Sequence, residues 1–157
     1  MIQLKSKLKD YSLDFINQIY PTQLEKYNFI IIDKKVFKLY ENIFSQVDKK
    51  KYLKIDVNEG AKEFKNIHRV IDKMISIEAN RSYKILAVGG GVIQDLVGFI
   101  CSIYFRGIKW DYYPTTLLSM GDSCIGGKTS INYKSYKNIL GTFYPPDKII
   151  CYVPFVS

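Results

Sequence analysis

An apolar segment at residues 84–88 runs directly into three consecutive glycines, Gly89–Gly91, and then into a second apolar segment with helical spacing. A short run rich in Ile, Leu and Val that ends at glycine predicts a buried strand. Glycines between a strand and a helix let a phosphate approach the backbone, close to the free N–H groups of the first helical turn. The junction predicts an α/β fold with an anion site, although a tight turn alone explains the glycines as well.

The segments on either side repeat this alternation. Residues 29–32, FIII, predict a buried strand that ends at Asp33, and residues 35–44 have helical spacing. A second strand is expected over residues 52–57, followed by a helix within residues 58–80. The apolar face of that helix is expected to hold Phe64, Ile67, Ile71, Met74 and Ile75.

After the glycines, residues 93–107 predict a helix that is apolar on most sides and closed by Gly107. Residues 108–113 alternate as a strand that Pro114 ends. Strands and helices in this order predict a Rossmann-like, mainly parallel sheet with helices on both faces. We expect one domain over residues 1–157, because 47% hydrophobic residues can fill one core of this size.

Composition excludes several other classes of protein. No apolar run approaches the roughly 20 residues of a membrane span, and Cys101, Cys124 and Cys151 lack the spacing of a disulfide framework or zinc knuckle. We therefore expect a cytoplasmic protein. The net charge of +8 suggests nucleic-acid binding as a distant alternative, because most of the lysines lie in the first 84 residues, where acidic residues are interleaved with them.

Two common phosphate motifs fail when they are aligned with the glycines. A dinucleotide fingerprint that starts at Gly89 would need glycine where Gln94 stands. A P-loop that ends in Gly127, Lys128 and Thr129 would need glycine where Asp122 stands. The sequence supports neither motif.

The segment from Pro114 to Asn138 concentrates polar side chains suited to binding a ligand. One of the hydroxyls of Thr115 and Thr116 is expected to cap a helical turn while the other faces the ligand. Downstream, a carboxylate, two cations and an amide follow: Asp122, Lys128, Lys137 and Asn138. A flexible surface loop is the alternative, but the apolar residues woven through the segment speak against it.

Several motifs together resemble the 3-dehydroquinate synthase family of sugar-phosphate cyclases. They are GGGVIQDLVGF, IYFRG, YPTTLLSMGDSCIGGKTSIN and YKNILGTFYPP, in the family's order between Val88 and Pro146. The resemblance extends more loosely to Asp33 and to the E-x-x-K pair of Glu59 and Lys62. It implies an N-terminal domain that binds NAD, followed in the family by a helical domain that holds a catalytic metal, zinc or cobalt.

The resemblance also implies roles for individual residues. The implied NAD contacts are Asp33, Glu59, Lys62, Gly90, Gly91, Val92, Asp95, Thr115, Thr116 and Lys137. The implied substrate contacts are Arg106, Asp122, Lys128 and Asn138, of which Asp122 and Lys128 are the candidate catalytic residues.

The implied reaction belongs to the shikimate pathway of aromatic amino acid biosynthesis. NAD takes a hydride from a secondary alcohol of a sugar-acid phosphate, phosphate leaves, the hydride returns, and the opened sugar closes in an aldol step. Cations suit this chemistry because they hold a phosphate dianion and offset its growing charge. The family resemblance further implies a homodimer.

The sequence departs from the family pattern in ways that leave alternatives open. The family's metal ligands, one Glu and two His, belong to the second domain, which we expect to be absent from residues 1–157. The one histidine of the sequence, His68, is expected at the surface or at its boundary with the core. Gln94 stands where small residues are frequent. A 2-epi-5-epi-valiolone synthase-like cyclase and a non-catalytic nucleotide-binding module remain alternatives, and we expect this chain alone to be inactive.

Overall fold

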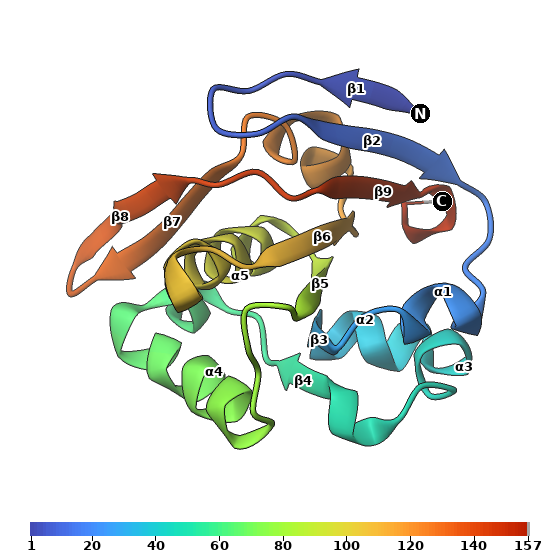
Figure 1. Ribbon diagram of the computed structural model, residues 1–157, viewed down its shortest axis with the longest axis horizontal. Coiled ribbons are helices and arrows are strands. Elements are labelled where there is room, and N and C mark those ends of the chain that lie inside the picture. The colour runs from blue at the N-terminus through green and yellow to red at the C-terminus, as the bar shows by residue number, and fades with distance from the viewer. Residues whose placement is uncertain (157) are drawn as a thin grey trace.

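Seven strands form one sheet in the order β1-β2-β9-β6-β5-β3-β4, in a computed structural model that describes residues 1–156, without the side chain of Glu59 (Figure 1). All neighbouring strands are parallel except the antiparallel pair β1 and β2. The strands are β1 (Ile2–Leu4), β2 (Tyr11–Ile16), β3 (Phe29–Asp33), β4 (Tyr52–Ile55), β5 (Lys84–Gly89), β6 (Lys109–Pro114) and β9 (Lys148–Tyr152). The predicted α/β class with a mainly parallel sheet is confirmed.

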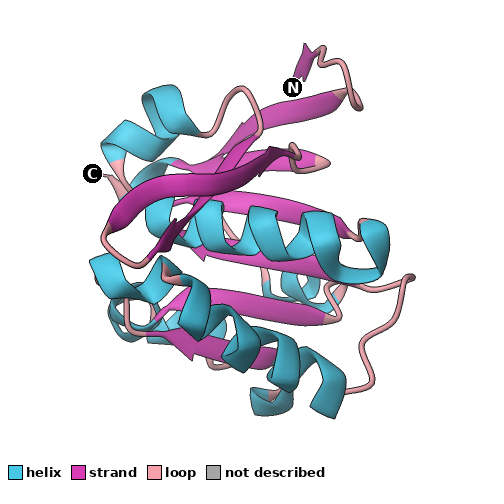
Figure 2. Ribbon diagram, turned by 90° about the vertical axis from the view of Figure 1, so that its left-hand side faces the viewer, coloured by secondary structure: helices cyan, strands magenta, loops and turns pink. Residues whose placement is uncertain are grey.

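Helices cover both faces of this sheet. The long helices α4 (Phe64–Ser76) and α5 (Gly91–Ile103) lie on one face, where Figure 2 shows them in front of the strands. The short helices α1 (Pro21–Glu25), α2 (Lys34–Leu39) and α3 (Glu41–Phe44) pack on the other face. The central strands are therefore buried on both sides, which is why they read as continuous apolar runs.

The strand order reverses between β3 and β5. The chain passes from β3 to β4 on one side, and then crosses back to β5 on the other side of β3. In parallel sheets, such a switch point opens a crevice beyond the carboxyl ends of the strands, where ligands bind. The triple glycine lies at this end of β5.

A separate two-stranded hairpin lies across α5, as Figure 1 shows. Its strands are β7 (Lys128–Tyr133) and β8 (Tyr136–Phe143), which pair antiparallel. A Cβ atom placed on Gly98 of α5 would lie 2.6 Å from Cγ2 of Thr129, and one on Gly141 would lie 2.1 Å from the Thr129 carbonyl oxygen. The hairpin can approach α5 this closely because neither position carries a side chain.

The strand at β6 is buried on both faces, which corrects the expected alternation of buried and exposed residues. Asp111 is wholly buried, and its Oδ2 atom accepts a hydrogen bond from the Tyr27 hydroxyl at 2.7 Å and lies 2.9 Å from the Lys84 ammonium. Burial beside this carboxylate raises the pKa of Tyr27, so the phenol stays protonated and acts as a donor. The ion pair joins β5 to β6, and the Tyr27 hydrogen bond ties both strands to the segment before β3.

Three predicted helices differ in detail from those observed. The helix expected at residues 35–44 breaks at Tyr40, whose hydroxyl donates to the carbonyl oxygen of Pro154. On α4, Phe64 and Ile75 were wrongly assigned to the buried face, since both are more than half exposed. Phe64 instead packs edge-on against Tyr133 of the hairpin. Gly107 ends a 3-10 turn at Tyr104–Arg106, rather than α5 itself.

None of the helices within residues 1–156 has the length and apolar composition needed to cross a lipid bilayer.

We predict that Gly98→Ala destabilises the protein. A Cβ atom at this position would also lie 3.1 Å from Trp110, and such overpacking costs about 1–3 kcal/mol, more than the ~1 kcal/mol that alanine gains in a helix. Urea unfolding followed by circular dichroism measures the difference. Gly121→Ala is the matched control, because no atom lies within 4 Å of the added methyl group; equal stabilities of the two variants would contradict the packing described.

We also predict that Tyr27→Phe lowers the free energy of unfolding by about 1.5–3 kcal/mol, because it removes a donor to a buried carboxylate. Thermal unfolding checks this value. Tyr20→Phe loses a hydroxyl that donates to Gln18 at the exposed surface, and should cost less than about 0.5 kcal/mol. A loss that is the same in both variants would show that the Asp111 contact contributes nothing.

Candidate functional site

A cavity of about 530 Å³ lies between the first turns of α5, the π-helical turn Ser119–Ser123 and the hairpin. Each of these three elements contributes polar side chains to its wall. The lining residues are Gly91, Gln94, Asp95, Asp122, Ser123, Ile125, Lys128, Thr129, Ser130, Asn138, Gly141, Thr142 and Phe143. Five residues predicted from the sequence therefore share one cavity: Gly91, Asp95, Asp122, Lys128 and Asn138.

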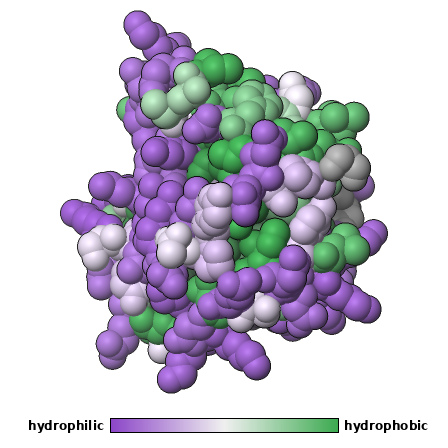
Figure 3. Space-filling model, turned by 90° about the vertical axis from the view of Figure 1, so that its right-hand side faces the viewer, coloured by the Kyte–Doolittle hydropathy of each residue, from purple (hydrophilic) through white to green (hydrophobic). Residues whose placement is uncertain are grey.

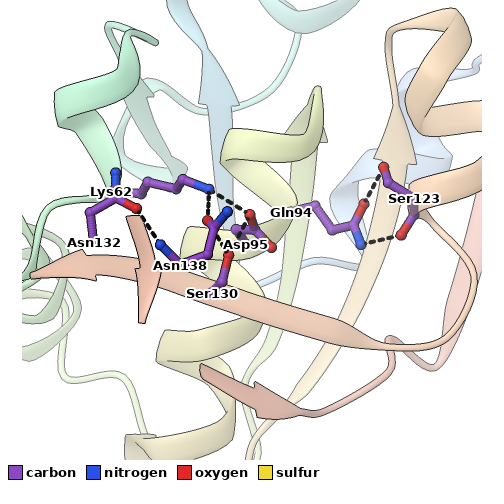
Figure 4. A network of polar contacts seen from close by, with 7 residues as sticks. All are labelled: Lys62, Gln94, Asp95, Ser123, Ser130, Asn132 and Asn138. Carbon is purple, nitrogen blue, oxygen red and sulfur yellow. Dashed lines mark hydrogen bonds and ion pairs between the residues drawn. The ribbon is translucent and has the colours of Figure 1, made fainter. Parts of the chain in front are cut away.

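Four side chains at the edge of this cavity form a closed ring of hydrogen bonds (Figure 4). The Lys62 ammonium lies 2.9 Å from Oδ2 of Asp95 and 2.6 Å from Oδ1 of Asn138. The Ser130 hydroxyl lies 2.8 Å and 2.9 Å from the same two oxygens. The ring joins the 3-10 turn Glu59–Lys62, α5, β7 and β8 at one point.

The charged pair within the ring is largely shielded from water. The side chain of Lys62 is 8% exposed and that of Asp95 is 21% exposed. Partial burial strengthens their attraction relative to an exposed pair, and the additional hydrogen bonds compensate for lost hydration. Asp95 is the fifth residue of α5 and faces the hairpin, so it does not act in the first turn of the helix, where the sequence placed it.

A second pair of contacts fixes the turn that carries Asp122. The Gln94 amide donates to the carbonyl oxygen of Ser123 at 2.6 Å and accepts from the Ser123 hydroxyl at 3.2 Å (Figure 4). Gln94 is only 4% exposed. A small residue at this position would leave the turn without either contact.

The glycine turn between β5 and α5 is held by backbone and side-chain donors. The carbonyl oxygen of Gly89 accepts from the Tyr112 hydroxyl at 2.9 Å and from the Thr115 N–H at 3.1 Å. Gly90 caps α5 without a side-chain hydrogen bond, so no cap side chain satisfies the first N–H groups of the helix in the part of the chain that the structure describes. This arrangement suits an anion at the start of α5.

Of the two threonines after β6, Thr116 has the predicted capping role. The Thr116 hydroxyl accepts from the Ser119 N–H at 3.2 Å, so it caps the following helical turn. A Cβ atom on Gly90 would lie 3.1 Å from Cγ2 of Thr116, which places this threonine beside the glycine turn. Thr115 is half-buried next to it, and its role toward a ligand stays a prediction.

The other predicted residues lie outside the cavity lining. Asp33, at the end of β3, caps α2 by accepting from the Lys35 N–H at 2.8 Å. Val92 is the second residue of α5, and Lys137 lies on the exposed strand β8. Arg106 follows the carboxyl end of α5, a full helix length from Gly91, so the structure does not bring it to the cavity. The side chain of Glu59 lies outside the described part of the chain.

Sequence reasoning missed the polar residues that support the predicted ones. Ser130 completes the ring, and Oδ1 of the buried Asn132 accepts from the Asn138 N–H at 2.9 Å. Both stand in the run KTSIN, whose alternation of buried Thr129 and Ile131 with Ser130 is the signal of a strand. A strand assignment would have placed Ser130 on the same face as Lys128.

Within the described residues, no three His, Cys, Asp or Glu side chains come together as a possible metal site. His68 is exposed on α4, as predicted.

The mainly parallel sheet, its switch point and the glycine turn define a Rossmann-like α/β domain. The family model described as 3-dehydroquinate synthase N-terminal matches residues 52–157. The chain therefore belongs to the 3-dehydroquinate synthase family.

Curated relatives agree with this assignment. The chain is 36% identical over 166 residues to the 3-dehydroquinate synthase of Streptococcus equi subsp. equi (strain 4047), covering 99% of this chain and 46% of the relative. It is 39% identical over 158 residues to that of Dictyoglomus thermophilum, covering 96% and 44%. The chain thus spans about half the length of the relatives it matches.

A solved structure gives the same result for the fold. The chain superimposes with a TM-score of 0.83 and 28% identity on ValA, the 2-epi-5-epi-valiolone synthase from Streptomyces hygroscopicus subsp. jinggangensis 5008, solved with bound NAD⁺ and Zn²⁺. The match covers 99% of this chain and 46% of that one. The family of sugar-phosphate cyclases expected from the motifs is confirmed.

The three thiols of this chain should be unreactive in the folded state. All are buried, and burial raises the pKa of Cys124, beside the Asp122 turn, to about 11. Since the thiolate is the reactive form, and a raised pKa keeps the thiol protonated at pH 8, we predict slow labelling by a disulfide reagent at pH 8 and rapid labelling of three thiols in denaturant. Rapid labelling of the folded chain would contradict the burial of these residues.

Proposed function

We propose that this chain supplies the NAD site and part of the substrate site of a 3-dehydroquinate synthase that cyclises a sugar-acid phosphate with loss of phosphate. The observation that carries the proposal is the ring of Lys62, Asp95, Ser130 and Asn138. It joins two residues implied as NAD contacts to one implied as a substrate contact, next to a cavity.

On the cofactor side, the uncapped start of α5 suits the pyrophosphate of NAD. Gly90, Gly91 and Val92 supply backbone there, and Thr115 and Thr116 lie across the turn. Asp95 and Lys62 lie one turn further along. When bound, NAD supplies a hydride acceptor that returns the hydride later in the cycle.

On the substrate side, the cavity offers groups of both signs. Lys128 and Asp122 are both exposed on its wall, so both are accessible to a bound molecule. The Lys128 ammonium suits a phosphate dianion and offsets the charge that grows as phosphate departs. The Asp122 carboxylate would accept a hydrogen bond from a substrate hydroxyl and hold that hydroxyl in place.

The residues that line the cavity do not form a zinc site. ValA holds Zn²⁺ together with NAD⁺, whereas the cavity of this chain is lined by two carboxylates and no histidine or cysteine among the described residues. A partner domain or a further segment with one Glu and two His would complete the family's site.

Two alternatives keep specific support. A 2-epi-5-epi-valiolone synthase-like activity is favoured by the match to ValA, and substrate tests with the two sugar phosphates separate it from the first proposal. A non-catalytic nucleotide-binding module would share NAD binding but no turnover. The proposal includes a homodimer and a cytoplasmic location. It does not include nucleic-acid binding, because acidic residues are interleaved with the lysines.

Calorimetric titration with NAD tests the cofactor site. We predict that the folded chain binds NAD, and that Lys62→Met weakens binding at least about tenfold, since it removes a partly buried cation from the ring. Lys65→Met is the matched control, because the Lys65 side chain is 75% exposed and pairs with the neighbouring Glu63; this variant should bind NAD as the unchanged chain does.

A folded chain that shows no NAD binding would contradict the proposed cofactor site. Phosphate release assays test the second part, and we expect no release of phosphate by this chain alone. Release from a sugar-acid phosphate would show that residues 1–157 hold a complete catalytic site.

A further inference from the structure

Two donors and two acceptors at the edge of the cavity make all four possible contacts with one another. The Lys62 ammonium and the Ser130 hydroxyl both lie within hydrogen-bonding distance of Asp95 Oδ2 and Asn138 Oδ1, at 2.6 to 2.9 Å (Figure 4). The ammonium has three protons and bonds both oxygens at once, whereas the hydroxyl has one proton and serves one oxygen at a time. Ser130 is thus the second donor for both acceptors.

We propose that Ser130 is a positioning residue that fixes the side chains of Asp95 and Asn138 for ligand binding. The inference rests on the proposed NAD function for its effect on affinity. Ser130 belongs to neither the implied cofactor contacts nor the implied substrate contacts, and it acts through the two residues that it holds.

The ring decides which atoms face a ligand. Because Oδ2 of Asp95 is engaged, its Oδ1 atom has no hydrogen bond among the described residues and is left to accept one from a ligand hydroxyl. Because Oδ1 of Asn138 is engaged by two donors, its amide nitrogen is the group left to donate. The wall therefore presents an acceptor beside an amide donor, a pair suited to a sugar hydroxyl next to an anionic oxygen.

The backbone of Asn138 is fixed independently of Ser130. Its φ angle is +54°, and its N–H donates to Oδ1 of the buried Asn132 at 2.9 Å. Loss of the Ser130 hydroxyl should therefore remove one of the two donors to the Asn138 side chain, which becomes more mobile while Lys62 still contacts its Oδ1 atom, and leave the backbone in place. A more mobile Asn138 side chain with an unchanged Asn138 backbone distinguishes this effect from a general loosening of the hairpin, which would raise the mobility of both.

Ser130→Ala tests the proposal, with Ser130→Thr as the conservative variant that keeps the hydroxyl. Ser102→Ala is the matched control, because Ser102 also lies between α5 and the hairpin, where its Oγ accepts from the Thr142 hydroxyl at 3.1 Å, but lies outside the cavity lining. Thermal unfolding establishes that each variant is folded. The two measurements are ¹⁵N relaxation of the Asn138 side-chain amide and calorimetric titration with NAD.

We expect the order parameter of the Asn138 side-chain amide to fall in Ser130→Ala, while that of the Asn138 backbone amide stays unchanged. In Ser130→Thr and Ser102→Ala the side-chain order parameter should equal that of the unchanged chain. NAD affinity should fall about three- to tenfold in Ser130→Ala, the effect of one hydrogen bond. An unchanged side-chain order parameter, or an equal fall in Ser102→Ala, would overturn the positioning role. If the unchanged chain fails to bind NAD, the proposed function fails, and the order parameters still decide the role of Ser130.

Discussion

The site depends on one steric constraint, the close approach of the β7–β8 hairpin to helix α5. Gly98 and Gly141 leave room for Thr129 between the helix and the second strand of the hairpin. Because the hairpin lies this close, Ser130 and Asn138 reach Asp95 and Lys62, and the polar wall of the cavity forms. The ring of Lys62, Asp95, Ser130 and Asn138 thus depends on a packing contact between Thr129 and two glycines.

The rest of the fold provides a rigid base for this contact. The central strands are buried on both faces, and the Asp111, Lys84 and Tyr27 group closes the amino end of the sheet. Figure 3 shows that the side of the molecule that faces right in Figure 1 carries both polar and apolar areas. The cavity is lined by residues of α5, of the turn Ser119–Ser123 and of the hairpin.

The sequence predicted the elements whose signals are local. The runs at β3 and β5 are continuous and apolar, so their burial and the glycine turn after β5 followed directly. The strands β1, β2 and β9 and the hairpin were not predicted. Strand β8 exposes nearly all its residues, from Tyr136 to Phe143, so it lacks the pattern that periodicity detects. The hairpin depends on pairing and on Gly98, which are long-range effects.

The candidate site divides in the same way. Motif resemblance found Gly91, Asp95, Asp122, Lys128 and Asn138, which the structure brings to one cavity. Arg106 lies beyond the far end of α5, and its predicted role is untested by this geometry. The role of Ser130 and the contact of Gln94 with Ser123 could not be predicted, because these contacts join residues 35 and 29 positions apart, which meet only after folding.

Mapping of NAD-induced chemical-shift changes on the ¹⁵N-labelled chain tests the central claim most directly. We predict that the largest changes fall on Gly89 to Asp95, on Lys62, on Thr115 and Thr116, and on Asn138. We expect none on the exposed face of α4 around His68. Changes scattered over the lysine-rich first half, or an unperturbed glycine turn at saturating NAD, would contradict it.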